Sequence, residues 1–212
     1  FVLEDRNNFS IDANDLISQA CEHDAVIFVN PNSPTGVYCD SMGDIVKQIA
    51  CSQNPDSVCK MIWVDETYIN YLPDAVSLEA MCTVLPELVV CKSMSKCYAL
   101  SGLRVAYAVS QSMSMLKRYI PPWAVSLPGQ HAPVAALRNE TYYGEQYEVI
   151  HGEREKMQSA LEASGFRVFP GVANYLLTYL PEESSYSSVG FIEACRARGL
   201  FVRDAQNKGV SL

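Results

Sequence analysis

Lys96 is the residue of this sequence whose surroundings most suggest chemistry. It lies in the stretch SMSK, directly after the apolar run LVVC, and Arg104 follows eight positions later. Most lysines are solvated surface cations. A lysine in an apolar pocket near other cations has a lowered pKa, however, and can attack a carbonyl carbon. Two interpretations are therefore open, a solvated loop between strands or a site built around one lysine.

Polar residues that could act together with Lys96 lie just after three predicted strands. They are Asn32 and Ser33 after residues 25–29, Asp65 and Tyr68 after or at the end of residues 60–65, and Ser93 and Ser95 after residues 88–92. In open α/β sheets, ligands bind at the carboxyl ends of the strands. We therefore expect these side chains to share one edge of the sheet.

An aldehyde cofactor such as pyridoxal phosphate needs several partner groups, and this sequence has a candidate for each of them. Besides a lysine amine for its aldehyde, it needs a carboxylate that keeps its ring nitrogen protonated, for which Asp65 is the candidate. Tyr68 could donate to its phenolic oxygen, and Arg104 and Ser93 could bind its phosphate. Each residue also has a plain structural explanation, since Asp65 can cap the next segment and Arg104 can pair with a surface carboxylate.

The elements that must position these residues read as an α/β fold. Apolar runs at 25–29, 60–65, 88–92 and 104–110 predict strands, and residues 41–52, 111–120 and about 128–165 predict helices, the last closed by Gly165. We predict a three-layer α/β/α domain with a mostly parallel sheet over residues 1–150. A smaller α+β domain follows over residues 151–212, with the long helix bridging the two.

Composition excludes several classes of protein. The 212 residues are 49% hydrophobic and 19% charged, as in a packed globular chain. A net charge of −8 argues against a nucleic-acid partner, and no apolar run is long enough to span a membrane. Eight cysteines without a C-x-x-C pair, with three histidines, predict reduced thiols in a cytoplasmic protein and no metal site. Because the chain opens on Phe1, we expect it to be part of a longer protein.

The stretches NPNSPTG, VDETYINY, SMSKCYALSGLRVAY and PPWAVS, in this order and spacing, resemble the fold-type I pyridoxal-phosphate aminotransferases. The closest branch looks like histidinol-phosphate aminotransferase and threonine-phosphate decarboxylase. The resemblance implies pyridoxal 5'-phosphate as cofactor, with Lys96 as its Schiff-base lysine and proton carrier. It makes Asp65 the partner of the ring nitrogen and Tyr68 the donor to the phenolic oxygen. It also implies a homodimer acting on small amino-acid and oxo-acid substrates.

By the same resemblance Ser93 and Arg104 are phosphate ligands, with Ser95 as a helper. Arg203, in FVRDAQNK, matches an arginine that histidinol-phosphate aminotransferases place at the substrate's phosphate. The position before PTG, commonly an asparagine in the family, is Ser33 here. Either its hydroxyl or Tyr68 alone would serve the phenolic oxygen, and Asn32 is the neighbouring candidate.

The leading hypothesis is an aminotransferase that moves an amino group between a phosphorylated, amino-acid-like substrate and 2-oxoglutarate. A decarboxylase of an amino-acid phosphate on the same scaffold is the alternative, and the residues of this chain do not separate the two. A third hypothesis is a non-enzymatic regulator with an aminotransferase-like domain. It would require a DNA-binding domain, and the acidic balance of this chain argues against one in the residues at hand.

Overall fold

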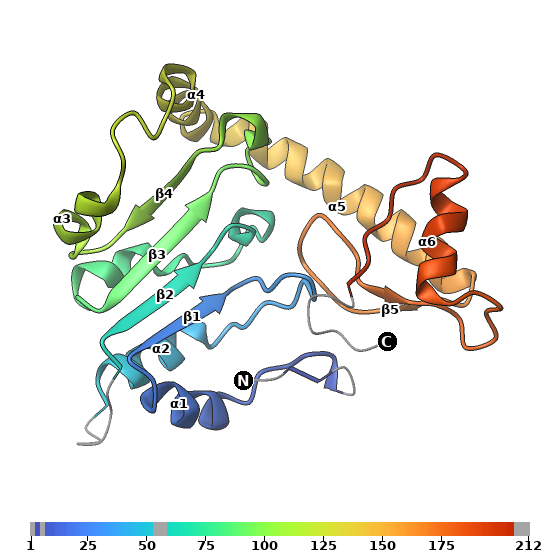
Figure 1. Cartoon of the computed structure of the whole chain (residues 1–212), viewed down its shortest axis with the longest axis horizontal. Coiled ribbons are helices and arrows are strands. Elements are labelled where there is room, and N and C mark those ends of the chain that lie inside the picture. Colours follow the sequence, from blue (N-terminus) through green and yellow to red (C-terminus); the bar gives the residue numbers. More distant parts are fainter. Residues whose placement is uncertain (1–2, 5–6, 53–58, 206–212) are drawn as a thin grey trace.

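The computed structural model describes residues 3–4, 7–52 and 59–205. Its centre is a four-stranded sheet in the order β1 (Ala25–Val29), β2 (Met61–Asp65), β3 (Leu88–Ser93) and β4 (Ala106–Val109) (Figure 1). β1 pairs parallel with β2, and β2 with β3, whereas β4 is antiparallel to β3. The α/β class and the mostly parallel sheet are confirmed, and each strand lies within two residues of its predicted range.

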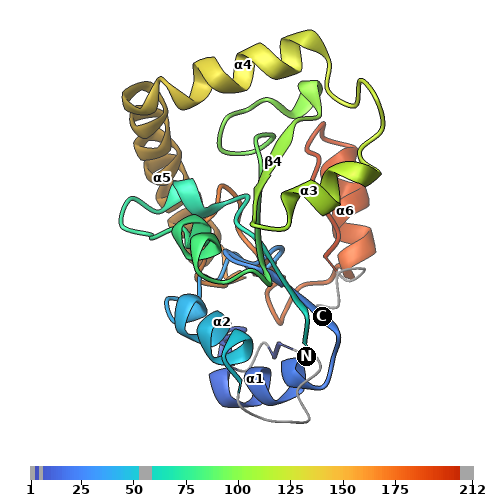
Figure 2. The ribbon, with the colours of Figure 1, turned by 90° about the vertical axis from the view of Figure 1, so that its left-hand side faces the viewer.

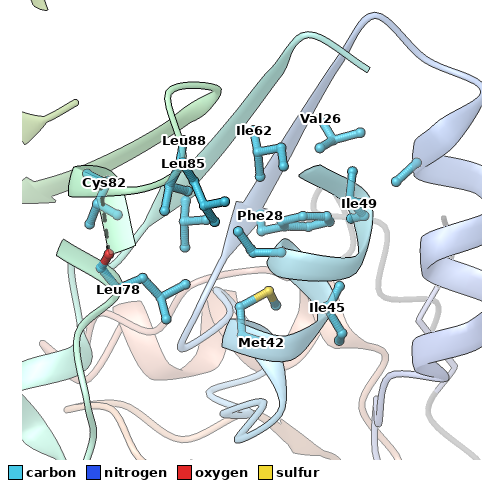
Figure 3. Close-up of a cluster of buried hydrophobic side chains, with 14 of the residues drawn as sticks. Val26, Phe28, Met42, Ile45, Ile49, Ile62, Leu78, Cys82, Leu85 and Leu88 are labelled. Atoms are coloured by element: carbon cyan, nitrogen blue, oxygen red, sulfur yellow. Dashed lines mark hydrogen bonds between the residues drawn. The ribbon is translucent and has the colours of Figure 1, made fainter. Parts of the chain in front are cut away.

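One face of the sheet carries the main core. Helices α1 (Ala13–Cys21) and α2 (Met42–Ala50) and the 3-10 helix η3 (Leu78–Thr83) pack against it. Successive strand residues point to opposite faces, so every second residue of β1 and β2 enters this core. It contains Val26, Phe28, Ile62, Val64, Leu88 and Val90 from the strands and Ile45, Val46 and Ile49 from α2 (Figure 3). Ile27, on the opposite face, is 71% exposed.

The helices after β4 differ in one respect from the prediction. The chain forms α3 (Met113–Leu116), the 3-10 turn η5 (Lys117–Tyr119), α4 (Leu127–Leu137) and α5 (Glu140–Ala163). The prediction of a single helix over residues 128–165 is therefore wrong, because the helix is interrupted at Asn139. Asn139 has ψ of 51°, and its Nδ2 donates to the Ala135 carbonyl at 2.6 Å. Such a side chain competes with helical hydrogen bonds.

A smaller group of elements follows α5. Gly165, with φ of +84°, lies just past the end of α5, as a glycine at this position does in many helices. β5 (Arg167–Val168) and β6 (Thr178–Tyr179) then form an antiparallel pair, and α6 (Ser188–Arg196) packs beside them (Figure 1). The predicted domain boundary at residues 150 and 151 falls inside α5 and stays a prediction.

The two views agree on the placement of the helices. α4 lies at the opposite end of the molecule from α1 and α2 (Figure 2). No helix among the described residues is long and apolar enough to cross a membrane. All eight cysteines are free thiols. In the described ranges no group of three or more His, Cys, Asp or Glu side chains could hold a metal ion.

Candidate active site

The carboxyl ends of β1, β2 and β3 lie side by side. The strands are in register, with Val29 opposite Asp65 and Asp65 opposite Cys91. The loops that leave these ends carry the residues singled out from the sequence. Parallel pairing therefore brings Ser33, Asp65 and the segment from Ser93 onward to one edge of the sheet, where ligands bind in α/β proteins.

The Asp65 carboxylate is anchored through one of its oxygens. Oδ1 accepts a hydrogen bond from the Thr67 backbone N–H at 2.9 Å and another from the Thr67 hydroxyl. The Thr67 hydroxyl oxygen in turn accepts from the Ser93 N–H at 3.2 Å, which ties the end of β2 to the end of β3. Asp65 Oδ2 has no hydrogen bond within the described ranges, so one oxygen stays available to a ligand. Thr67 was not predicted as a site residue, although a threonine two positions after a strand-end aspartate often bonds to it.

Ser93 and Ser95 place two hydroxyls together. Their Oγ atoms lie 2.8 Å apart, and the Ser95 N–H donates to Ser93 Oγ at 3.3 Å. The Met94 N–H donates to the Val105 carbonyl at 3.2 Å, which brings Arg104, two residues before β4, beside this pair. Its guanidinium, however, donates to the Ser101 carbonyl at 3.3 Å and not to the serines. Arg104 also has φ of +53°, in the left-handed region.

A cavity of about 330 Å³ opens beside these loops, within the size range of small-molecule sites. Its lining includes four predicted site residues: Ser33, Tyr68, Lys96 and Arg203. The other lining residues are Pro34, Asn174, Tyr175, Leu176, Leu177, Asp204 and Ala205, none of which was predicted. Lys96 is exposed, so the closed apolar pocket considered for it is not formed by the described residues. Asn32, Asp65, Ser93, Ser95 and Arg104 lie outside the lining.

Two tyrosines flank the Ser33 hydroxyl. The rings of Tyr68 and Tyr175 are 5.3 Å apart and nearly perpendicular, and the Ser33 side chain lies close enough to both phenols to act on their pKa values. Burial raises the pKa of Tyr68, against the opposing effects of Ser33 and the Arg203 charge. Burial raises the pKa of Tyr175 to about 12. Both phenols are therefore protonated at neutral pH and can donate hydrogen bonds.

The structure distinguishes Ser33 from Asn32. The Asn32 side chain is used within its own turn, where Nδ2 donates to Thr35 Oγ1 at 3.0 Å. The backbone carbonyl of Asn32 accepts a hydrogen bond from the Tyr175 hydroxyl at 2.7 Å. Of these two neighbours only Ser33 lines the cavity.

A close backbone contact brings the second part of the chain to this loop. The Val172 N–H donates to the Gly36 carbonyl at 2.9 Å. A Cβ built on Gly36 would lie 3.0 Å from Gly171 Cα, and one built on Gly171 would lie 3.1 Å from Gly36 Cα. Side chains larger than hydrogen would push the two segments apart, which favours glycine at both positions. This contact places Tyr175 at the cavity. The sequence NYLLTYL around Tyr175 looks like an ordinary strand and does not indicate this position.

The family described as aminotransferase class I and II matches residues 1–210. The chain belongs to the class I and II aminotransferases. The resemblance stated from the four motifs is thereby confirmed, and the strand-end loops described above belong to an aminotransferase fold.

Relatives of this aminotransferase chain carry several names. It is 29% identical over 203 residues to a histidinol-phosphate aminotransferase of Oleidesulfovibrio alaskensis, covering 93% of this chain and 52% of that protein. It is 32% identical over 213 residues to an aromatic amino acid aminotransferase of Nocardia farcinica, covering 96% and 56%. The chain thus spans about half the length of the curated relatives it matches.

Solved structures share its fold. A histidinol-phosphate aminotransferase from Sinorhizobium meliloti, in complex with pyridoxal-5'-phosphate, superposes with a TM-score of 0.79 at 20% identity, over 91% of this chain and 52% of that one. A decarboxylase from Sulfurospirillum multivorans gives a TM-score of 0.81 at 23% identity, over 100% and 62%. At these identities the likeness establishes the fold.

Proposed function

We propose that this chain carries the cofactor site of a pyridoxal-phosphate-dependent aminotransferase. The whole protein would transfer an amino group between a phosphorylated, histidinol-phosphate-like substrate and 2-oxoglutarate. The observation that supports this most directly is the single cavity lined by Lys96, Ser33, Tyr68 and Arg203. Family membership and the relative solved with pyridoxal-5'-phosphate support the choice of cofactor.

The groups at the strand ends fit the aldehyde and the ring nitrogen of this cofactor. Lys96 offers its amine at the cavity, and none of the described residues forms an ion pair with its Nζ. Asp65 would hold a proton on the ring nitrogen through the oxygen that Thr67 leaves open. When bound, the cofactor supplies an electron sink for the charge left when a bond at the substrate's α-carbon breaks. Lys96 Nζ would take the α-proton and return it.

The phenolic oxygen and the phosphate also find donors. Tyr68, protonated at neutral pH, would donate to the phenolic oxygen, and the nearby Ser33 hydroxyl would orient the phenol. The Ser93 and Ser95 hydroxyls and the backbone between them would receive the phosphate. Arg104 would join them if its guanidinium turned from the Ser101 carbonyl, a single hydrogen bond at the surface.

Arg203 supports a phosphorylated substrate. It is exposed and lines the same cavity as Lys96, so an anion held there would lie beside the reacting groups. The planar guanidinium binds phosphate through two parallel hydrogen bonds. We include a homodimer in the proposal, since Tyr119, Ile120 and Trp123 are 83%, 59% and 96% exposed and form an apolar surface that a second subunit would cover.

Replacement of Lys96 tests the assignment. We expect Lys96→Ala to lose the visible absorbance of lysine-bound cofactor and amino transfer to 2-oxoglutarate together. Lys156→Ala is the matched control, because Lys156 is an exposed lysine on α5 that pairs with Glu153 at 2.7 Å. Amino transfer by Lys96→Ala at the rate of the unchanged protein would refute the proposal.

A lyase is the second candidate. It is favoured by the likeness to the decarboxylase of S. multivorans and to an L-threonine-O-3-phosphate decarboxylase of Porphyromonas gingivalis. The second of these superposes with a TM-score of 0.72 at 21% identity, over 87% of this chain and 55% of that one. Both reactions need the same lysine and cofactor. Measuring CO₂ release and amino transfer side by side, with one phosphorylated amino acid, separates them. Release of CO₂ without formation of glutamate would replace the transferase by the lyase.

A further inference from the structure

A buried group of charged side chains lies behind the strand ends that carry the candidate site. Lys92 Nζ is 2.8 Å from Glu79 Oε1 and 3.4 Å from Glu66 Oε2. It also donates to Ser77 Oγ at 2.9 Å. Glu66 is 1% exposed and Lys92 is 7% exposed, so water hardly reaches either charge. The proposed reaction uses none of these residues.

Both oxygens of the Glu66 carboxylate, and one oxygen of the partly exposed Glu79, accept hydrogen bonds in this group. Glu66 Oε1 accepts from the Leu78 N–H at 2.8 Å, and Oε2 accepts from the Ser77 hydroxyl at 2.6 Å. Glu79 Oε1 accepts from the Tyr107 hydroxyl at 2.9 Å. Tyr107 stands directly opposite Lys92 in the β3–β4 ladder. The group therefore joins β2, β3, β4 and η3 around a single ammonium.

Glu66 and Lys92 are each the chain neighbour of a site residue. Asp65 precedes Glu66 and Ser93 follows Lys92. The sheet pairing continues here, since the Glu66 N–H donates to the Cys91 carbonyl at 2.8 Å. Successive side chains along a strand point to opposite faces. The Glu66–Lys92 ion pair therefore lies on one face of the sheet, and the Asp65 carboxylate and the Ser93 hydroxyl lie on the other. The pair links the ends of β2 and β3 that carry these two site residues.

We propose that Lys92 is a positioning residue for cofactor binding. By binding Glu66 and Glu79 it sets the spacing between the ends of β2 and β3, and so between Asp65 and Ser93. This inference rests on the proposed function, in which those two residues meet the ring nitrogen and the phosphate of one rigid molecule. A neutral side chain at position 92 leaves Glu66 buried without its cation, which is strongly destabilising. Protonation of Glu66 or a shift of the segments relieves that charge, and either one changes the contacts that hold the two strand ends.

Cofactor affinity measures this role independently of turnover. We expect Lys92→Met to raise the Kd for pyridoxal 5'-phosphate, titrated into cofactor-free protein, by at least about tenfold, the size of one hydrogen bond to a charged group lost at Asp65 or Ser93. Lys92→Arg keeps the charge that Glu66 needs and should weaken binding less than Lys92→Met. Lys60→Met is the matched control: Lys60 pairs with Asp24 at 3.4 Å, is 80% exposed and precedes β2 at the far end of the sheet. Its Kd should not change.

The folded fraction of each variant, taken from urea unfolding, separates positioning from mere stability. Loss of stability in Lys92→Met with an unchanged Kd for the folded protein would overturn the inference. If Lys92→Met does not fold, Glu66→Gln decides, because the amide can still accept from the Leu78 N–H and Lys92 keeps Glu79. Glu66→Gln should weaken cofactor binding by about three- to tenfold, because it removes one carboxylate partner of the buried Lys92 ammonium while Glu79 stays paired with it. An unchanged Kd in Glu66→Gln would overturn the inference as well. Failure of the unchanged protein to bind the cofactor would instead refute the proposed function.

Discussion

The contact between Gly36 and Gly171 can be tested by adding one methyl group at each position. In Gly171→Ala the new Cβ would lie 3.1 Å from both Gly36 Cα and the Thr35 carbonyl oxygen. These are backbone atoms, so no rotamer change relieves the overlap. In Gly36→Ala the Cβ meets Gly171 Cα at 3.0 Å, and the residue must also keep φ of +75°.

The two variants differ by the cost of that backbone conformation. Overpacking of this kind costs about 1–3 kcal/mol. A left-handed conformation of an L-residue adds about 1–2 kcal/mol. Reduced freedom of the unfolded chain returns about 0.4–1 kcal/mol in each case. We therefore expect the free energy of unfolding to fall by ~1–2 kcal/mol in Gly171→Ala and by ~2–4 kcal/mol in Gly36→Ala.

Urea unfolding followed by circular dichroism measures both values. Gly152→Ala is the control, since Gly152 lies within α5 and a Cβ there meets no atom within 4 Å. Alanine in a helix interior should stabilise by ~0.5–1 kcal/mol. A Gly171→Ala protein as stable as Gly152→Ala would refute the backbone contact. Equal losses in Gly36→Ala and Gly171→Ala would refute the contribution of the left-handed conformation.

Two further outcomes are expected. Arg203→Ala should weaken the binding of a phosphorylated substrate by about 2 kcal/mol, the cost of a lost charge-assisted hydrogen bond, and leave the binding of its unphosphorylated analogue unchanged, as KM values would show. The control is Arg198→Ala, since Arg198 is an exposed arginine bonded to the Ala194 carbonyl. Equal effects of Arg203→Ala on both substrates would contradict the assignment. Burial raises the pKa of the Cys97 thiol from 9.0 to about 12, so stability fully present below pH 9 should be lost as the pH rises to about 12. Unfolding free energies measured from pH 8 upward in unchanged protein and in Cys97→Ala check this, and the variant should show the shallower decline.

Local pattern predicted the strands well because their signal is short in range. The apolar runs at β1, β2 and β3 need only their own residues to be recognised. The break between α4 and α5 was missed because apolar and helix-favouring residues continue through it. Asn139 ends α4 through a bond to Ala135 that competes with the helix, and a single polar residue carries little weight in a helical pattern.

The candidate site divides in the same way. Ser33, Tyr68, Lys96 and Arg203 were predicted and are brought together at one cavity. The part played by Tyr175 could not be predicted. Its hydroxyl bonds to Asn32, 143 positions away, and nothing near NYLLTYL indicates that partner.

By itself the amino-acid sequence determined the α/β class, the strand ends at which polar side chains gather, and the spacing of Lys96 and Arg104. These features depend on neighbours a few residues apart, through side-chain alternation and turn chemistry. Only the tertiary structure decided that Ser33 and not Asn32 lines the cavity, that Gly36 meets Gly171, and that Lys92 is buried between Glu66 and Glu79. Each of these depends on which distant segments pack together, and that is set by the burial of the whole core and not by any local pattern.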